Sequence, residues 1–162
     1  MKTIPLTRGL VAIVDDEDFD RLRVYRWHAA VSQKNRTAYA RRNEGTRKIH
    51  MHRVILQAPP STLVDHVNSN GLDNTRGNLR LCTRAENCRH CRKSVRPKLS
   101  RFKGITWNKA AGKFQATIRL NRVSHYLGLF TSELAAAQAY DAAARQLHMT
   151  FALTNFGEGE SK

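Results

Sequence analysis

Four polar residues between positions 65 and 87 have the types and the spacing that phosphodiester hydrolysis needs. Asp65 and His66 are adjacent, Asn78 follows His66 by 12 positions, and Asn87 follows Asn78 by 9. A histidine side chain can deprotonate water near neutral pH. Mg²⁺ or Mn²⁺ can stabilise charge on the phosphate and the leaving oxygen, and both ions prefer the side-chain oxygens of Asp and Asn. The four residues therefore indicate a metal-assisted attack of water on a phosphodiester.

The adjacent pair needs an element that separates its two side chains. Successive side chains on a strand point to opposite faces, so Asp65 could hold a metal ion while His66 addresses water. A second short strand is expected at 79–82, with the sequence LRLC. The remaining asparagines of the intervening loop are assigned to turns, because Asn tolerates left-handed backbone and the pair NG marks a tight turn. These turn residues are Asn68, Asn70 and Asn74.

A helix is expected directly after the second strand. Thr83 is suited to the N-cap, and Glu86 follows it by three positions, which is the spacing of a capping box. Asn87 then lies on this helix. Cys88 and Cys91 have the spacing of a zinc-ligand pair, but a structural zinc ion needs four ligands. A basic helix with unpaired thiols is preferred, and a zinc site would have to draw its other ligands from Cys82, His90, His50 and His52.

The same residues resemble an HNH endonuclease of the phage and intron homing type, in its His-Asn-Asn variant. The resemblance covers residues 49–92 and includes the lead-in MHRVIL. It implies a ββα-metal finger in which His66 is the general base and the side-chain oxygen of Asn78 orients the imidazole. It also implies that Asp65 and Asn87 bind a single Mg²⁺ or Mn²⁺ ion. Because Asn87 stands where many members have His, the ion should bind loosely and nicking is favoured over complete scission.

The charge balance points to a polyanionic partner. The 162 residues include 28 Lys and Arg against 13 Asp and Glu, a net charge of +15. Five of the acids lie together at 15–20, so the rest of the chain is more basic still. No apolar stretch approaches the roughly 20 residues of a spanning helix, and neither a signal peptide nor a membrane anchor is visible. Three cysteines suit a reducing compartment, so the expected location is the cytoplasm, for a chain of a bacterial host or one encoded by a phage.

The first 56 residues indicate short strands joined by hairpin turns. The acidic run at 15–20 is interpreted as the capped start of a short helix whose solvated face points away from nucleic acid. His52 is interpreted as a strand residue near the DNA backbone, with a catalytic role as the alternative. The expected strands lie at 3–6, 10–14, 27–32, 37–42 and 49–56.

A second module follows a basic linker at 94–102, where Pro97 interrupts any continuous helix. Apolar residues alternate with polar ones over 114–120, which is typical of a strand with one buried face. Over 132–147 the spacing becomes helical, with a stripe of mostly small side chains that includes Tyr140 in the core. The stripe consists of Ala136, Ala139, Tyr140, Ala143 and Leu147.

Residues 102–156 resemble the DNA-binding domain of plant Apetala and ethylene-response factors, in the stretches KGITW, GKFQATIR, YLGLFTSELAAAQAYDAAA and LTNF. The resemblance implies a three-stranded antiparallel sheet laid in the major groove and backed by one helix. Arg119 could contact guanine edges, and the residues better placed for phosphates are Lys103, Lys109, Lys113 and Arg122. Trp107 and Tyr126 are either DNA contacts or sheet packing. The expected contacts are Lys103, Trp107, Lys109, Lys113, Gln115, Thr117, Arg119, Arg122 and Tyr126, with Arg89, Arg92 and Lys93 from the basic helix.

Together these patterns predict an α+β chain with three parts. Residues 1–93 form a β-rich region with the nuclease finger, with its core at 49–92. Residues 94–102 form the linker, and residues 103–157 form the DNA-binding module. The predicted function is a metal-dependent, site-directed endonuclease on double-stranded DNA, acting as a monomer or weak dimer without an obligate protein partner. The rival from another class is a non-catalytic, sequence-specific DNA-binding regulator, and a third reading is an RNA-directed nuclease or binder.

Overall fold

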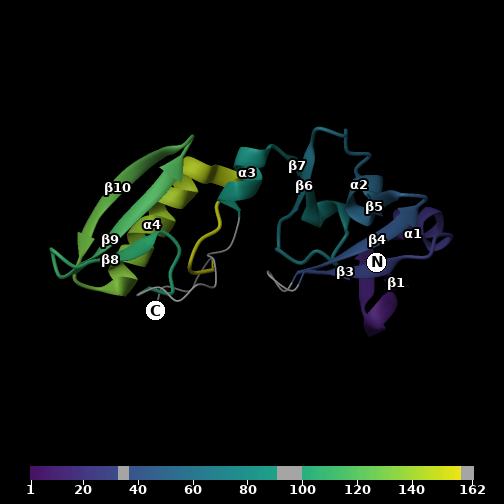
Figure 1. The fold of residues 1–162 in the computed structure, drawn as a ribbon, viewed down its shortest axis with the longest axis horizontal. Coiled ribbons are helices and arrows are strands. Elements are labelled where there is room, and N and C mark those ends of the chain that lie inside the picture. Colours follow the sequence, from purple (N-terminus) through teal and green to yellow (C-terminus); the bar gives the residue numbers. More distant parts are fainter. Residues whose placement is uncertain (33–36, 91–99, 158–162) are drawn as a thin grey trace. The chain divides into compact units, whose positions relative to one another are not determined.

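The computed structural model describes residues 1–32, 37–90 and 100–157. The chain divides into two compact units, Met1–Arg84 and Ala85–Lys162. Figure 1 shows small sheets in both units, with helices between and against the strands. The described residues form an α+β chain with four α-helices and four small sheets, which confirms the predicted fold class at this level. None of these helices combines the length and the apolar character needed to cross a membrane.

The first unit contains three small antiparallel sheets. Strands β1 (Lys2–Pro5) and β2 (Val11–Val14) form a hairpin around a short 3-10 turn, η1 (Thr7–Gly9). Strands β3 (His28–Val31), β4 (Ala38–Glu44) and β5 (Arg47–His50) form a three-stranded meander. Strands β6 (Leu63–His66) and β7 (Leu79–Cys82) form the third sheet. The strands expected at 3–6, 10–14, 27–32, 37–42 and 79–82 are present, with ends shifted by at most two residues.

The lead-in to the third sheet differs from the expectation. A strand was predicted over 49–56, but β5 ends at His50 and a short helix, α2 (Met51–Ile55), follows at once. Met51 and Ile55 lie one helical turn apart and are both buried, so the helix carries two core residues on one face. A strand would have pointed these two side chains to the same face as well, which is why the apolar spacing alone did not distinguish the two structures.

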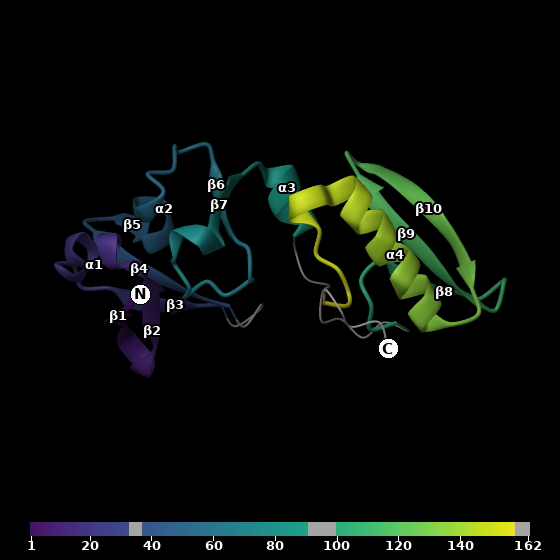
Figure 2. The ribbon, with the colours of Figure 1, turned by 180° about the vertical axis from the view of Figure 1, so that it is seen from behind.

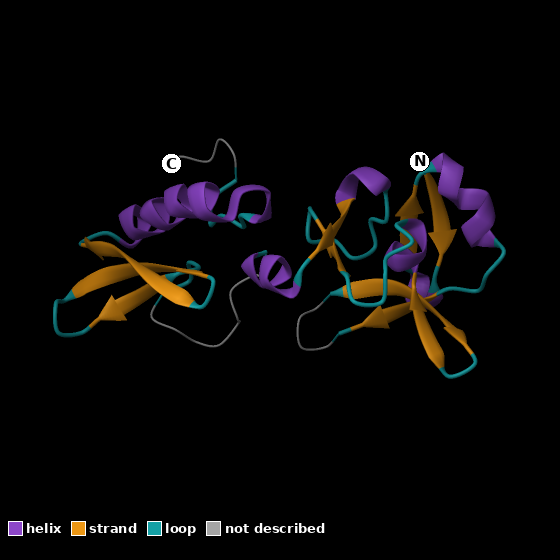
Figure 3. Cartoon of the chain, turned by 90° about the horizontal axis from the view of Figure 1, so that it is seen from above, coloured by secondary structure: helices purple, strands orange, loops and turns teal. Residues whose placement is uncertain are grey.

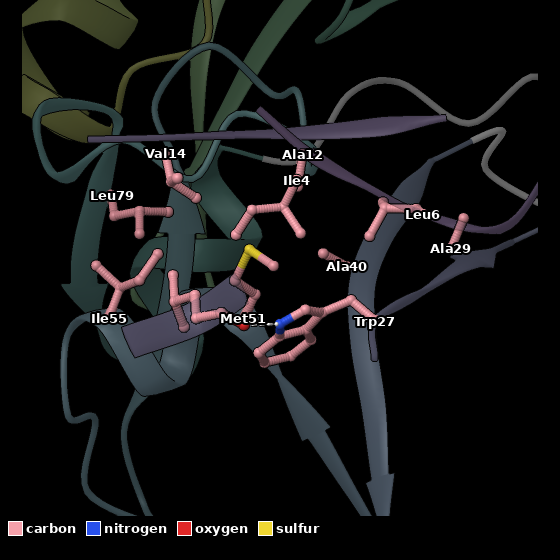
Figure 4. Close-up of a cluster of buried hydrophobic side chains, with 11 residues drawn as sticks. Ile4, Leu6, Ala12, Val14, Trp27, Ala29, Ala40, Met51, Ile55 and Leu79 are labelled. Carbon is pink, nitrogen blue, oxygen red and sulfur yellow. Dashed lines mark hydrogen bonds between the residues drawn. The ribbon is translucent and has the colours of Figure 1, made fainter. Parts of the chain in front are cut away.

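One apolar core joins the elements of the first unit (Figure 4). Trp27 spans this core, and its indole N–H donates to the carbonyl of Leu22 at 2.8 Å, so the polar end of the ring is satisfied. Leu79 brings strand β7 into the same core. The buried members are Ile4, Leu6, Ala12, Val14, Leu22, Trp27, Ala29, Ala40, Met51, Ile55 and Leu79.

The acidic run forms helix α1 (Asp16–Arg23), but it is not simply a solvated face. Asp18 is buried and accepts hydrogen bonds from the side chains of Arg21 and Arg76. Asp15 occupies the N-cap position, yet its carboxylate accepts from the backbone N–H of Arg76 at 2.7 Å rather than from its own helix. The run therefore ties α1 to the segment around residue 76, and only its exposed members fit the predicted solvated face.

The second unit contains one antiparallel sheet of three strands, with a long helix packed on one face (Figure 2 and Figure 3). The strands are β8 (Ile105–Asn108), β9 (Lys113–Leu120) and β10 (Val123–Phe130), in the order β10-β9-β8. The helix is α4 (Glu133–His148), and the hydroxyl of Ser132 caps it by accepting from the N–H of Ala135 at 3.4 Å. A short helix, α3 (Arg84–Arg89), precedes this sheet, and a 3-10 turn, η3 (Met149–Phe151), follows α4.

Small side chains let α4 lie close to the sheet. Its most buried apolar residues are Ala136, Ala137, Tyr140 and Ala144, which shows that the buried face extends beyond the predicted stripe. At Gly104, which has a φ of +78°, an added Cβ would lie 2.1 Å from the ring of Tyr140. Only glycine fits this approach. The predicted core position of Tyr140 is confirmed.

A buried carboxylate fixes the end of the second unit. Asp141 accepts hydrogen bonds from the backbone N–H groups of Asn155 and Phe156 at 2.8 and 2.9 Å. The side chain of Asn155 in turn bonds to both backbone groups of Lys103. These bonds hold the segment after α4 against the start of the sheet.

Candidate active site

The hairpin of β6 and β7 positions the first two site residues. Asp65 is paired with Arg80 and His66 with Leu79 in the antiparallel register. Side chains of directly paired residues share a face, so His66 lies on the face of Leu79, which belongs to the core, and Asp65 lies on the opposite face with Arg80. Asp65 and His66 are both buried, with exposed fractions of 7% and 5%. The expected strand is present, and it directs the carboxylate and the imidazole to different faces.

His66 lies among aromatic rings from other elements of the first unit. Its ring centroid is 5.7 Å from that of Tyr39 on β4 and 5.1 Å from that of His52 on α2, with the His52 ring perpendicular. Nε2 of His66 is buried and bonds to no residue that the structure describes. Burial lowers the pKa of His66 below its ordinary value, although the side chain of Asn74 and the charges of Asp65 and Asp73 act in the opposite direction. At neutral pH the imidazole is therefore uncharged.

His52 contacts the candidate base rather than the protein surface. It stacks on His50 at 5.2 Å and lies 5.8 Å from Tyr39. Burial, aided by the nearby His66, His50 and Arg53, lowers the pKa of His52 to about 3. His52 lies on α2, so the expected strand position is wrong for this residue, whereas its place near the DNA backbone stays a prediction. Sequence reasoning missed Tyr39 altogether, and the only signal for His52 was the spacing of two histidines before a run of apolar residues.

Asp65 is held by a guanidinium. Arg80 donates from Nε and Nη2 to the same oxygen, Oδ2 of Asp65, at 2.9 and 2.6 Å. The side chains of Asp65 and Arg80 are only 9% and 18% exposed, so this ion pair is shielded from water. Such a pair is costly to break from one side, because an unpaired buried charge would remain. No pattern in the sequence indicated that Arg80 belongs to the site.

Asn78 organises the loop between the two strands. Its Oδ1 accepts from the backbone N–H of Asn68 at 2.9 Å, and its Nδ2 donates to the carbonyl of Asp73 at 2.8 Å. Asn78 ends the 3-10 turn η2 (Arg76–Asn78) and is itself buried. Its amide oxygen thus has a partner in the loop, while its predicted role in orienting His66 remains a prediction.

The other loop asparagines divide into two kinds. Asn68 and Asn70 accept hydrogen bonds from backbone N–H groups two residues further on, as turn residues do. Asn74 is different, because it is fully buried and its Oδ1 bonds to no residue that the structure describes. Its side chain raises the pKa of His66, although no hydrogen bond of ordinary length joins the two. Asn74 is therefore a site neighbour as well as the predicted turn residue.

The N-terminal strands hold this loop in place. The backbone N–H of Ile13 donates to the carbonyl of Leu72 at 2.9 Å, and the carbonyl of Ile13 accepts from the N–H of Asn74 at 2.8 Å. Strand β2 therefore forms a parallel bridge with the loop at Asp73. Arg76 adds its bonds to Asp15 and Asp18. The acidic run at 15–20 therefore helps to hold the loop of the candidate site in place. The spacing of residues within 49–92 could not indicate this contact.

The candidate metal ligands fit a hard divalent ion only as an oxygen pair. Among the residues that the structure describes there is no group of three or more His, Cys, Asp or Glu side chains that could hold a metal ion. One carboxylate and one amide oxygen, with water and phosphate oxygens, would still suit Mg²⁺ or Mn²⁺. Asp65 supplies a buried carboxylate, but the ion would have to share it with Arg80. Asn87 lies on α3, in the second unit, and its part in the pair rests on its sequence spacing.

The zinc interpretation also remains a prediction. Cys82 is buried and Cys88 is exposed. Cys91, Arg92 and Lys93 lie outside the described residues, as does most of the expected linker.

Five of the expected DNA contacts lie on one sheet face of the second unit. Tyr126 pairs with Thr117 and Ser124 with Arg119, so these residues lie on the face opposite Ala116 and Ile118. Trp107 behaves differently, because it pairs with Phe114 and its ring packs edge-on against that residue at 4.8 Å. The polar face carries Thr106, Asn108, Lys113, Gln115, Thr117, Arg119, Ser124 and Tyr126.

The expected contacts outside the strands are arranged less uniformly. Lys109 and Arg122 are exposed in the two turns of the sheet. The ammonium group of Lys103 donates to the carbonyl of Arg89 at 2.6 Å, and Arg89 itself donates to the side chain of Asn121 at 3.0 Å. The first two residues are therefore available to phosphates, whereas the last two are already engaged within the unit.

Comparison with known proteins gives one informative similarity. No protein-family model matches the chain. A protein of Acanthamoeba polyphaga mimivirus, named as an uncharacterised HNH endonuclease, is 31% identical over 114 residues. The match covers 67% of this chain and 58% of the viral protein, so the chain spans less than two thirds of that relative's length. This similarity supports an HNH-type nuclease.

Proposed function

We propose that the chain is a metal-dependent, site-directed DNA endonuclease of the HNH homing type, with a separate DNA-targeting module. The observation that carries the proposal is the hairpin of β6 and β7, which buries an uncharged imidazole and a carboxylate at adjacent positions on opposite faces. Neighbouring groups with different protonation states are typical of sites that run acid and base chemistry at neutral pH.

His66 is the general base in this proposal. Burial keeps its imidazole uncharged, so it can accept the proton of an attacking water molecule. Tyr39 and His52 both pack against the ring and restrict its orientation. Restricted orientation favours catalysis, because the base must meet the water at hydrogen-bond distance.

Asp65 and Asn87 would hold a single Mg²⁺ or Mn²⁺ ion. When bound, such an ion stabilises negative charge on the phosphate and on the departing 3′ oxygen. The pair offers one charged and one neutral oxygen ligand, which predicts loose binding. Loose binding favours a slow enzyme that nicks one strand.

The second unit supplies affinity for double-stranded DNA. Lys113 and Arg119 are exposed on the polar face of the sheet, and Lys109 and Arg122 flank it in turns. Contacts to phosphates release bound counterions, so binding should weaken steeply as salt rises. Gln115 and Arg119 can also reach base edges, although Gln115 already accepts from Asn108 at 3.1 Å.

A non-catalytic, sequence-specific DNA-binding regulator is the second candidate. The ion pair of Asp65 with Arg80 favours it, because a scaffold could use this pair for stability alone. The two functions differ in what replacement of His66 does. In a regulator the substitution affects folding or has no effect. In a nuclease it removes cleavage and leaves DNA binding intact.

The test is cleavage of DNA from the source genome with Mg²⁺ or Mn²⁺, followed by mapping of new strand ends. The wild type should produce defined ends, and both His66→Ala and the less disruptive His66→Gln should bind the same DNA without cutting. Circular dichroism spectra of the variants would show that they fold. A wild type that never cuts with either ion, while binding DNA, would establish the regulator instead.

A further inference from the structure

Arg80 and Asp65 form the most shielded ion pair of the candidate site. They lie directly opposite each other on β6 and β7, so the register itself brings the guanidinium to the carboxylate. Both donor atoms, Nε and Nη2, converge on Oδ2, at 2.9 and 2.6 Å. A cation of the protein thus occupies one of the two oxygens of the carboxylate that would hold a metal ion.

We propose that Arg80 competes with the divalent ion for Asp65 and thereby keeps the affinity of the site for free ions low. The proposal rests on the proposed function, in which Asp65 is a metal ligand. Arg80 is then a positioning residue. It holds the carboxylate of Asp65 in place before an ion binds, and it gives up part of its contact with that carboxylate when the ion binds.

The competition follows from charge and geometry. An arginine side chain stays protonated at every pH at which proteins fold, so its charge cannot be titrated away. An ion that shares Oδ2 would lie a few ångströms from the guanidinium, and repulsion between the two cations is poorly screened where both side chains are largely buried. The ion must therefore displace the N–H donors or bind beside a like charge, and either course weakens binding.

Bound DNA should raise the affinity of the site for its metal ion. A phosphodiester brings a negative charge and unprotonated oxygens to the same place, which offsets the charge of both cations. The site should consequently bind its ion well only when DNA is present. This coupling would limit the loading of the nuclease with metal away from its substrate.

The alternative role for Arg80, as a residue that helps Asp65 to bind the ion, predicts the opposite change in metal affinity. If the guanidinium only orients Asp65 for the ion, as an outer-shell partner does, its removal should weaken metal binding, often by 10–100-fold. Competition predicts the reverse sign. The direction of the change in metal affinity therefore separates the two roles without any measurement of cleavage.

The experiment measures Mn²⁺ binding to the full chain without DNA, by electron paramagnetic resonance and by isothermal titration calorimetry at low salt. Arg80→Gln removes the charge but keeps a hydrogen-bond donor, and Arg80→Lys keeps the charge but loses the two-pronged contact. Asp65→Asn removes the ligand. Arg23→Gln is the matched control, because Arg23 forms an exposed ion pair with Asp20 on α1 and its loss changes the net charge equally.

Arg80→Gln should tighten Mn²⁺ binding by about tenfold or more, with Arg80→Lys between it and the wild type. Arg23→Gln should change affinity less than about twofold, and Asp65→Asn should abolish binding. If Arg80→Gln does not fold, a tighter constant for Arg80→Lys supports the proposal. Unchanged or weaker binding in the variants that fold overturns it. If Asp65→Asn abolishes binding in that case, only the inference about Arg80 fails, whereas absence of Mn²⁺ binding in every protein also removes the metal-ligand role of Asp65.

Discussion

The two units use their polar residues in opposite ways. Around the hairpin of β6 and β7, the candidate base, its ring neighbour His52 and the candidate metal ligand are buried. On the sheet of the second unit, Lys113 and Arg119 are exposed, and they lie on the face opposite the residues that share a core with α4. The same chain therefore encloses the groups suited to chemistry and displays the groups suited to holding a polyanion.

This difference follows from what each task requires. A base must keep its lone pair and its orientation, and burial among rings secures both for His66 at the cost of desolvation. Contacts to phosphates need mobile, solvated cations whose number matters more than their exact position. Perturbing one unit should consequently change its own task while sparing the other.

The largest effect is expected at Gly104. Its positive φ and the 2.1 Å approach to Tyr140 mean that Gly104→Ala strains the backbone and displaces the ring, at a cost of at least about 3 kcal/mol. Thermal unfolding should show a destabilised second unit, and fluorescence anisotropy should show weaker binding to duplex DNA. Gly112→Ala is the control, since Gly112 also has a positive φ but no atom within 4 Å of the added Cβ. It should cost only about 1 kcal/mol, and equal losses in both variants would contradict the account.

The next effect concerns the support behind the hairpin. Burial alone would raise the pKa of Asp18, but its hydrogen bonds from Arg76 and Arg21 outweigh burial and lower it. Asp18→Asn should cost about 2–3 kcal/mol, less than a fully buried pair because both arginines are partly exposed. Urea unfolding would measure this loss. Asp20→Asn, at an exposed position of the same helix, should cost less than about 0.5 kcal/mol.

A pH dependence should mark the first unit. His52 has a folded-state pKa of about 3, against an ordinary value of 6.5 when unfolded. The unfolded chain therefore binds the proton more readily, and stability present above pH 6.5 is lost as pH falls towards 3. Between pH 7 and 5 the loss should be on the order of 1–2 kcal/mol. His52→Gln should reduce this slope in unfolding experiments, whereas His125→Gln, at an exposed position on β10, should leave it unchanged.

The smallest single effects are expected on the sheet face. Lys113→Ala and Arg119→Ala should each weaken binding to duplex DNA by about three- to fivefold and reduce the slope of the salt dependence by about 1. Fluorescence anisotropy at several salt concentrations would measure both quantities. Arg145→Ala is the control, because Arg145 is exposed on α4 rather than on the sheet. If the slope of the salt dependence is the same in all three variants, DNA binds to a surface other than the polar face of the sheet.

The sequence predicted the local elements better than their mutual support. Alternation over 114–120 and the helical spacing after Ser132 led directly to β9 and α4, because each pattern is periodic and lies within one element. The helix that carries Asn87 was likewise anticipated from a local capping signal, whereas the strand that carries His66 was inferred from the separation that the pair with Asp65 requires.

Contacts between distant segments could not be predicted in this way. Tyr39 reaches His66 from a strand 27 positions earlier in the chain, and Arg76 reaches Asp18 across 58 positions. Neither pairing leaves a periodic signal in the sequence. The error over 49–56 had another cause, since Met51 and Ile55 satisfy both a strand and a short helix.

The most direct test of the division of tasks is single-turnover cleavage of duplex DNA, measured as a function of protein concentration. His66→Gln should lower the saturating rate by about 10²–10⁴-fold at an unchanged half-saturating concentration. The double variant Lys113→Ala with Arg119→Ala should raise the half-saturating concentration and reach the wild-type rate. Cleavage by His66→Gln at the wild-type rate would contradict the assignment of catalysis to the buried imidazole.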